Sequence, residues 1–342
     1  MQVKNMVIHI PEKLSPLNTL NFSKYVATMH RESEFIYDFS QMQHCTPFGM
    51  LIVADAIRKN QKSFPNAEHI PIHYTETQGT EFATYMGFFQ MCGWDIGRIP
   101  TINSYGETYI PIKKISISSL QEQYLSSTIV LGEMIDRQSN DLAITLTQND
   151  AGRTTKLVQY CLREIIRNAF EHGNTSDVWV CGQYWESRSQ AQIAIIDSGC
   201  GIYKSLIRNR HYRPQTDKEA NELALKPGVT RTYGLKQDPN DVWSNSGYGL
   251  YMASTICCQG GSFWLCSGTD ATLINPSRQS HYDINYQGTA VCLDIKTNAI
   301  SDIDRILPEI ADKGSRVARQ QENGAVVTAS KASTIASITR KK

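Results

Sequence analysis

The chain has 342 residues, which is long enough for two domains that each bury a hydrophobic core. Its 34 Lys and Arg residues nearly balance its 33 Asp and Glu residues, and apart from residues 340–342 the basic side chains form no patch, which argues against nucleic-acid binding. No segment approaches the roughly 18 uninterrupted apolar residues of a membrane-spanning helix, so a membrane protein is not expected.

The first 112 residues are predicted to form a small α/β domain. Segments with the apolar pattern of strands alternate with segments that have the apolar period of helices. In chain order these are a strand at 6–10, a helix at 18–30, a strand at 34–39, a helix at 48–62, a strand at 70–74 and a helix at 80–91.

Residues 101–150 are rich in Ser, Thr, Gln and Asn, and we interpret residues 113–150 as a connector. A strand-like segment, YIPIKKISI, overlaps its start, and a helix is expected over Ser119–Gln138. At the other end of the chain, residues 299–342 are expected to form one helix, in SDIDRILPEIADK, followed by a mobile tail.

Residues 151–298 are predicted to form a second domain. A helix from Thr154 to His172 is followed by the strands VWVCGQYW and AQIAIID, a long segment rich in Gly, Lys and Arg, and a helix over Gly249–Cys258. Two more strands, SFWLCS and TAVCLDI, complete the domain. Two helices on one side of a mixed, largely antiparallel sheet give an α/β sandwich.

A carboxylate and an amide share one flank of the helix LVQYCLREIIRNAFEHG. Glu164 and Asn168 are four residues apart, which places them on the same helix face beside an apolar stripe. The amide oxygen is a suitable ligand for Mg²⁺, and the carboxylate can orient or deprotonate a nucleophile. Taken alone, this spacing is also common on solvated helix faces.

The segment DSGCGI ends the apolar strand QIAIID. Its glycines, Gly199 and Gly201, permit a tight turn and a close approach of the backbone to a ligand. Asp197 ends a buried strand, where its carboxylate can accept a hydrogen bond from an exocyclic amine such as that of adenine. An ordinary strand-to-loop turn is the alternative interpretation.

Two further glycine motifs follow. Gly247 and Gly249 precede a helix, where free backbone N–H groups and the helix dipole favour an anion such as a phosphate. Gly288 and Thr289 begin the last core strand, in which a threonine needs no special explanation. Each of these motifs alone is weak evidence for a ligand site.

In this order, and on these elements, the motifs resemble the ATP-binding domain of the gyrase, heat-shock chaperone, histidine kinase and MutL (GHKL, or Bergerat-fold) superfamily. The resemblance covers residues 154–296. It implies that Glu164 is the general base or polarises the attacking group, that Asn168 holds Mg²⁺, and that Asp197 binds adenine. In the family, the matching glycines hinge the ATP lid and reach the phosphates, so the resemblance implies a nucleotide-binding set of Asn168, Asp197, Gly199, Gly201, Ile202, Gly247, Tyr248, Gly249, Leu250 and Thr289.

A long segment between Ile202 and Ser246 exceeds most loops of compact domains, so we expect a functional lid. It carries several Lys and Arg residues, any of which is an alternative contact for the γ-phosphate. Lys226 and Arg231, which flank a PGVT turn, are the preferred candidates.

The string REIIRNAFEHG is similar to the anti-sigma-factor serine kinases and to histidine kinases. A sensor histidine kinase would need an acceptor histidine just upstream, and residues 115–160 contain none. The lid motif of MutL is absent, and there is no room for the transducer domain of gyrase, so a role in DNA topology is not expected.

The N-terminal segment FIYDFSQMQHCTPFGMLIVADAIRKNQ loosely resembles the middle of STAS domains, the fold of anti-sigma-factor antagonists. The position of their phosphorylated serine reads Thr46-Pro47-Phe48-Gly49 here. Thr46 is expected to cap the next helix or, alternatively, to accept phosphate. A generic α/β module is the other interpretation of this region.

Nine scattered cysteines without a C-x-x-C pair, and an N-terminus without a long apolar stretch, predict a reduced, cytoplasmic protein. The leading hypothesis is a regulatory protein that binds ATP and Mg²⁺, hydrolyses ATP, and couples lid closure to a protein partner. A Ser/Thr protein kinase of the anti-sigma-factor type and a non-hydrolysing, nucleotide-gated binding module are the alternatives. Dimerisation is frequent in this family, so a homodimer stays open.

Overall fold

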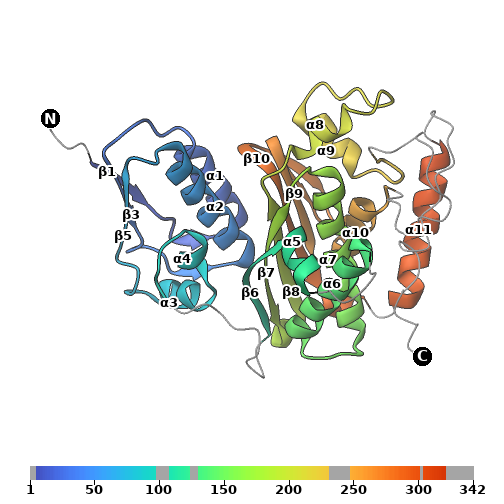
Figure 1. Ribbon diagram of the computed structural model, residues 1–342. Coiled ribbons are helices and arrows are strands. Elements are labelled where there is room, and N and C mark those ends of the chain that lie inside the picture. The colour runs from blue at the N-terminus through green and yellow to red at the C-terminus, as the bar shows by residue number, and fades with distance from the viewer. Residues whose placement is uncertain (1–4, 98–107, 124–129, 231–246, 301–302, 321–342) are drawn as a thin grey trace.

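The structure is a computed structural model that describes residues 5–97, 108–123, 130–230, 247–300 and 303–320. These residues have a mixed α/β architecture with a three-stranded sheet, a five-stranded sheet and a pair of two-residue strands. The layers run from left to right in Figure 1, beginning with the three-stranded sheet, then a pair of helices, the five-stranded sheet and a second group of helices.

The N-terminal part is built on a parallel sheet of order β1-β3-β5. Its elements are β1 (Asn5–His9), β2 (Lys13–Leu14), α1 (Pro16–Val26), β3 (Glu34–Asp38), β4 (His44–Cys45), α2 (Pro47–Ser63), β5 (Glu68–Ile72), α3 (Gln78–Tyr85) and α4 (Phe88–Met91). Helix α2 begins after Thr46, whose hydroxyl oxygen accepts a hydrogen bond from the Gly49 amide, and Pro47 is compatible with the first turn. Thr46 therefore caps helix α2, which was one of the two expectations for this residue.

The five-stranded sheet is antiparallel and has the order β6-β7-β8-β10-β9. Its strands are β6 (Tyr109–Ser116), β7 (Asp177–Trp185), β8 (Gln190–Asp197), β9 (Ser262–Ile274) and β10 (Gln279–Lys296). Helices α6 (Leu131–Thr147), α7 (Arg153–His172) and α10 (Gly249–Cys257) cover one face, and α11 (Ile303–Gln320) packs on α7 and α10.

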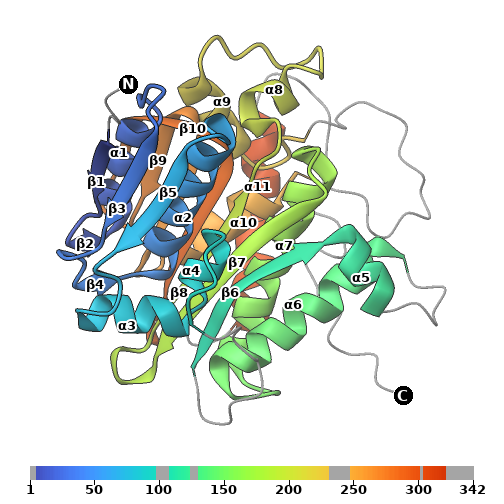
Figure 2. The same cartoon turned by 60° about the vertical axis from the view of Figure 1, so that its left-hand side comes forward.

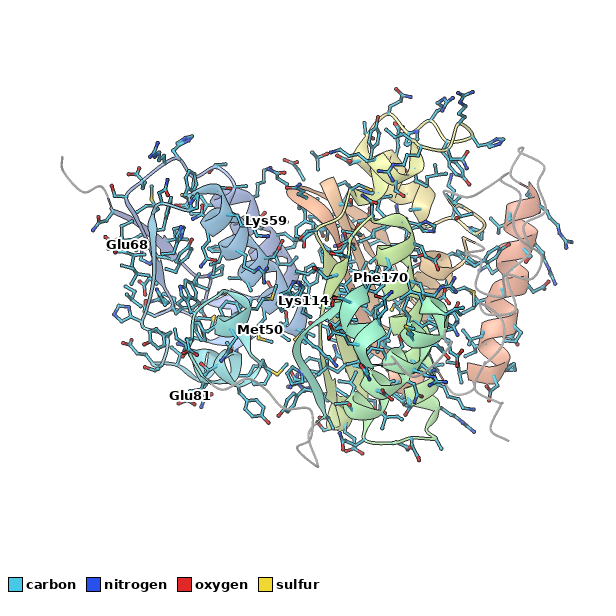
Figure 3. The ribbon with its side chains drawn as sticks, in the orientation of Figure 1. Met50, Lys59, Glu68, Glu81, Lys114 and Phe170 are labelled. Carbon is cyan, nitrogen blue, oxygen red and sulfur yellow. The ribbon has the colours of Figure 1, made fainter. Side chains whose placement is uncertain are left out.

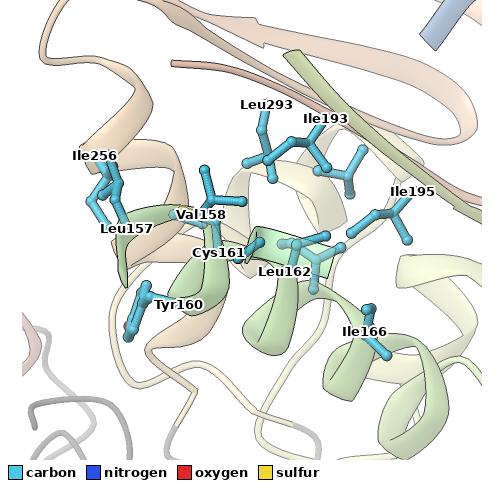
Figure 4. Packing of buried hydrophobic residues seen from close by; sticks show 14 of the residues in the cluster. Leu157, Val158, Tyr160, Cys161, Leu162, Ile166, Ile193, Ile195, Ile256 and Leu293 are labelled. Carbon is cyan, nitrogen blue, oxygen red and sulfur yellow. The ribbon is translucent and has the colours of Figure 1, made fainter. Parts of the chain in front are cut away.

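Helix α7 is fixed to this face by its apolar stripe. The predicted stripe residues are all buried, namely Leu157, Val158, Cys161, Leu162, Ile165, Ile166 and Ala169. Figure 4 shows several of them beside the sheet residues Ile193, Ile195 and Leu293. Burial of each large aliphatic side chain contributes about 1.5–3 kcal/mol, so this packing holds the polar flank of α7 in a defined place.

The segment interpreted as a connector, residues 113–150, takes part in the same layers. Strand β6 pairs with β7 from Tyr109 to Ser116, and the short helix α5 (Ile117–Gln123) follows it. Helix α6 adds Leu142 and Leu146 to the core beneath α7. The five-stranded sheet and its helical layer therefore begin well before Thr154.

The N-terminal part covers the opposite face of the five-stranded sheet (Figure 2). Every residue from Pro47 to Ile57 of α2 is buried, because this helix lies between the parallel sheet and strands β7 and β8. Helix α1 packs beside it on β10. One hydrophobic core includes Phe48 and Leu51 of α2 together with Ile196 and Cys292 of the large sheet, so the two parts are joined by an apolar interface.

The first half of the predicted lid folds over one end of the large sheet as α8 (Gly201–Leu206) and α9 (Asp217–Ala224). The side-chain amide of buried Asn221 donates hydrogen bonds to the carbonyl and the carboxylate of Asp270 on β9, at 3.1 and 3.0 Å. The second half of the lid, residues 231–246, and the predicted tail after residue 320 lie outside the described residues. Within the ranges that are described, no helix is long and apolar enough to cross a membrane.

Candidate functional site

A cleft lies between α7, the start of α10, the large sheet and the lid segment. It is lined by Ile165, Asn168, Ala169, His172, Gly173, Ile195, Asp197, Gly201, Ile202, Ser205, Leu206, Ala224, Val229, Thr230, Gly247, Gly249, Leu250, Thr289 and Val291. Aliphatic side chains of α7, β8 and β10 form its apolar floor, and a few polar groups converge on it. This mixture is typical of small-molecule sites.

The structure brings most of the predicted nucleotide-binding residues to this one cleft. Those that line it are Asn168, Asp197, Gly201, Ile202, Gly247, Gly249, Leu250 and Thr289. They come from α7, β8, the lid, α10 and β10, and they are separated by up to about a third of the chain. The motifs therefore converge in space as well as in order.

Glu164 and Asn168 lie against the first residue of α10. A Cβ atom at Gly249 would come within 2.6 Å of Glu164 Oε2 and 3.3 Å of Asn168 Nδ2, so only a glycine allows this close approach. The free amides that a helix N-terminus presents, and its positive dipole end, therefore lie beside a carboxylate and an amide. An anionic group would be favoured at this place.

Arg163 holds the other carboxylate oxygen of Glu164. Glu164 Oε1 accepts hydrogen bonds from Arg163 Nη2 at 2.8 Å and Nε at 3.2 Å. Arg163 is 3% exposed, and its guanidinium also lies 3.7 Å from Asp136 of α6. Although burial opposes its charge, the carboxylates of Glu164 and Asp136 keep the pKa of Arg163 above its ordinary value. Arg163 thus orients Glu164 so that Oε2 is the oxygen nearest Gly249.

Asp197 forms the polar end of β8. Its Oδ1 atom accepts a hydrogen bond from the Gly199 amide at 2.7 Å. Burial raises the pKa of Asp197 to about 6, and this rise is limited by hydrogen bonds from Gly199 and Thr289. A buried carboxylate at the edge of an apolar cleft is an acceptor for a neutral amine donor.

Ser267 of β9 secures the loop after Asp197, although no motif marks this residue. The Ile202 amide donates to Ser267 Oγ at 3.0 Å, and the same hydroxyl donates to the Gly288 carbonyl at 2.8 Å. The Cys200 amide donates to the Gly173 carbonyl at 2.7 Å. The loop is therefore tied to two strands and to the end of α7.

Several predicted site residues do not line the cleft. Glu164 is not a lining residue, but its Oε2 atom lies against Gly249, which lines the cleft, and Gly199 lies in the loop that supports Asp197. The side chain of Tyr248 is fully buried and points to α11, where its hydroxyl lies 3.4 Å from Ser315 Oγ. Lys226 is exposed just after α9 and is not a lining residue. Arg231 lies outside the described residues.

The residues that were missed fall into three kinds. The apolar floor residues Ile165, Ile195 and Val291 read as ordinary core positions, because a floor and a core have the same pattern. His172 lies one turn beyond Asn168 and within the string REIIRNAFEHG, so the helical spacing could have identified it. The lid residues Val229 and Thr230 carry no motif.

Residues 153–299 match the family model described as histidine kinase-, DNA gyrase B- and HSP90-like ATPase. The chain therefore contains a GHKL ATP-binding domain over these residues, and the resemblance noted in the sequence is confirmed. The match does not extend to the N-terminal part, where the STAS-like resemblance is not confirmed. No curated protein and no solved structure is significantly similar to the chain.

The residues of the cleft fit a magnesium nucleotide. In the described ranges no group of three or more His, Cys, Asp or Glu residues could hold a metal ion by itself. Asn168 lines the cleft together with Gly249, and its side-chain amide can offer one oxygen ligand to a metal ion that is bound there. Mg²⁺ prefers such a site, in which one or two protein oxygens combine with phosphate oxygens and water.

Proposed function

We propose that the chain binds ATP with Mg²⁺ in this cleft and hydrolyses it. The adenine amine donates a hydrogen bond to the Asp197 carboxylate, and the phosphates run to the N-terminus of α10. Asn168 holds Mg²⁺, which neutralises phosphate charge when it is bound. The apolar floor of the cleft excludes water from the adenine ring.

Glu164 is proposed to carry the chemical step. A water molecule attacks the γ-phosphorus and gives a proton to Glu164 Oε2, while the bond between the γ-phosphorus and the bridging oxygen of ADP breaks. Arg163 holds Oε1 and so orients the carboxylate for this transfer. The observation that carries the proposal is the position of Glu164 Oε2 and Asn168 against Gly249.

A protein partner is proposed to read the nucleotide state. Helices α8 and α9 form one side of the cleft, so closure of the lid over a nucleotide would change the surface that they present. The string REIIRNAFEHG supports a second candidate, the transfer of the γ-phosphoryl group to a Ser or Thr of such a partner.

Incubation of the purified chain with γ-labelled ATP and Mg²⁺ tests the proposal. Labelled free phosphate that appears with the wild-type chain, and not with Glu164→Gln, is the expected result. Label that stays on protein indicates a kinase. Tight nucleotide binding with neither product indicates a nucleotide-gated switch and overturns the hydrolytic proposal.

A further inference from the structure

One side chain of the N-terminal part reaches the strand that carries Thr289. Lys59 lies near the end of α2, on the side towards the large sheet (Figure 3). Its ammonium donates a hydrogen bond to the Gln287 carbonyl oxygen at 2.9 Å, and it lies 4.2 Å from the centre of the Tyr286 ring. Lys59 therefore contacts β10 at Gln287, two residues before Thr289, which lines the cleft.

Asp55, one turn earlier on α2, fixes this ammonium. Asp55 is buried, and its Oδ2 atom lies 2.6 Å from Lys59 Nζ. Burial raises the pKa of the Tyr286 hydroxyl, and the nearby carboxylates of Asp55 and Asp197 raise it further. Burial raises the pKa of Asp197, and the Lys59 charge, together with the hydrogen bonds from Gly199 and Thr289, limits this rise. Lys59 and Asp55 of the N-terminal part therefore lie within electrostatic range of groups on the large sheet, since Lys59 acts on Asp197 and Asp55 acts on Tyr286.

Gly288 is tightly packed between Gln287 and the cleft residue Thr289. It has a φ of +99°, and a Cβ atom there would overlap the carbonyl oxygen of Asp197 on β8. Its own carbonyl accepts the Ser267 hydroxyl at 2.8 Å. Because this glycine is packed without free space, a shift of Gln287 moves Thr289 or Asp197.

We propose that Lys59 is a positioning residue for the adenine-binding side of the cleft, through which the N-terminal part sets the nucleotide affinity. The inference rests on the proposed binding of ATP in this cleft. Lys59 is not a lining residue, so it acts through the Gln287–Thr289 backbone and through its charge near Asp197. A ligand or partner that moves α2 would change ATP affinity by the same route.

The test is a titration of the full chain with Mg²⁺-ATP by calorimetry, from pH 5.5 to 8, for four proteins. These are the wild type, Lys59→Met, Lys59→Arg and, as a control, Lys62→Met, which removes the same charge from an exposed position of the same helix. Lys59→Met is expected to weaken binding at pH 7 about 5- to 20-fold. It is also expected to raise the pH at which binding is lost on acidification, because Asp197 loses a neighbouring positive charge.

Lys59→Arg should bind ATP nearly as tightly as the wild type, and Lys62→Met should have the ATP affinity and the pH midpoint of the wild type. Tyr286, Thr289 and His172 also face Asp197 or the cleft, but they are the same in all four proteins. A difference between the proteins in the pH at which half of the ATP binding is lost is therefore due to the substituted lysine. A purely structural role of Lys59 would not move this midpoint.

Equal affinity and equal midpoint for the wild type and Lys59→Met would overturn the inference, and so would an equal loss in Lys62→Met. Asp55→Asn keeps Lys59 but removes the carboxylate that pairs with it, and this variant should weaken ATP binding about 2- to 5-fold. If Lys59→Met does not fold, an unchanged ATP affinity of Asp55→Asn would overturn the inference. A wild-type chain that binds no ATP would instead refute the proposed function.

Discussion

The two buried carboxylates of the site are held in different ways, one by the helical layer and one by the sheet. Glu164 of α7 is ion-paired with the buried guanidinium of Arg163 at 2.8 Å. Asp197 of β8 is held by the Gly199 amide at 2.7 Å and by Thr289, and burial raises its pKa to about 6. The first environment is ionic, whereas the second is mainly dipolar.

This difference separates the roles that each carboxylate can take. An ion pair fixes the direction of Glu164 and leaves one defined oxygen for proton transfer. Amide and hydroxyl dipoles in an apolar cleft instead suit Asp197 to a hydrogen bond with a neutral amine. Environments that distinguish two acidic groups are a general way to assign acid–base and binding roles.

Glu164→Gln should produce the largest effect, because it removes the proton acceptor on the helical side. ATP turnover is expected to fall about 10²- to 10⁴-fold, with the nucleotide dissociation constant nearly unchanged. Glu171→Gln is a matched control, since Glu171 also pairs with an arginine of α7, Arg167, at 2.8 Å. Retained turnover in Glu164→Gln would contradict the assignment of proton transfer to Glu164.

Arg163→Met should be the most destabilising change, because it leaves Glu164 and Asp136 without their buried cation. We expect the free energy of unfolding to fall by about 3–5 kcal/mol, measured by urea denaturation. Arg137→Met breaks an exposed pair with Glu133 and should cost less than about 1 kcal/mol. Similar losses in both variants would contradict an ionic anchor for Glu164.

Asp197→Asn should weaken ATP binding about 10- to 100-fold, because an amide accepts the adenine amine less well than a carboxylate. The measurement is a calorimetric titration at pH 7.5. Turnover at saturating ATP should change less than in Glu164→Gln. An unchanged ATP affinity would show that Asp197 of β8 does not bind adenine.

The pH dependence of stability gives the smallest predicted effect. The pKa of Asp197 is about 6 in the folded chain, against an ordinary value of 3.8, so the folded state holds the proton more tightly. This contribution is present below pH 4 and is lost as pH rises to about 6. Nucleotide-free Asp197→Asn should therefore be about 1–2 kcal/mol more stable than the wild type at pH 7, with no difference near pH 4. Parallel stability curves would contradict the buried, dipolar environment of Asp197.

The sequence predicted the motifs of the site because each is encoded locally. The four-residue spacing of Glu164 and Asn168 places both on one face of α7, and glycines flank Asp197 and the start of α10. These features need no knowledge of distant residues. Tyr248 was predicted to belong to the nucleotide-binding set, but its side chain does not line the cleft, because it is buried against α11, which begins more than fifty residues later.

Contacts between distant segments could not be read from the sequence. Ser267 supports the site from a strand that comes much later in the chain, and no motif marks it. Arg163 belongs to the string REIIRNAFEHG, but its pairing with Asp136 of α6 is seen only in the folded chain. Nor does an apolar helix such as α2 reveal whether it lies on one sheet or between two. The contact of Lys59 with Gln287 spans 228 residues of sequence, so only the folded chain places it behind the cleft.

The most direct test of the account is a crystal structure of the chain with Mg²⁺ and a non-hydrolysable ATP analogue. We expect the adenine amine to bind Asp197, the phosphates to lie at the N-terminus of α10, and Mg²⁺ to be held by Asn168. An analogue bound elsewhere, or in this cleft with its phosphates at Asp197, would contradict the assignment of the two carboxylates.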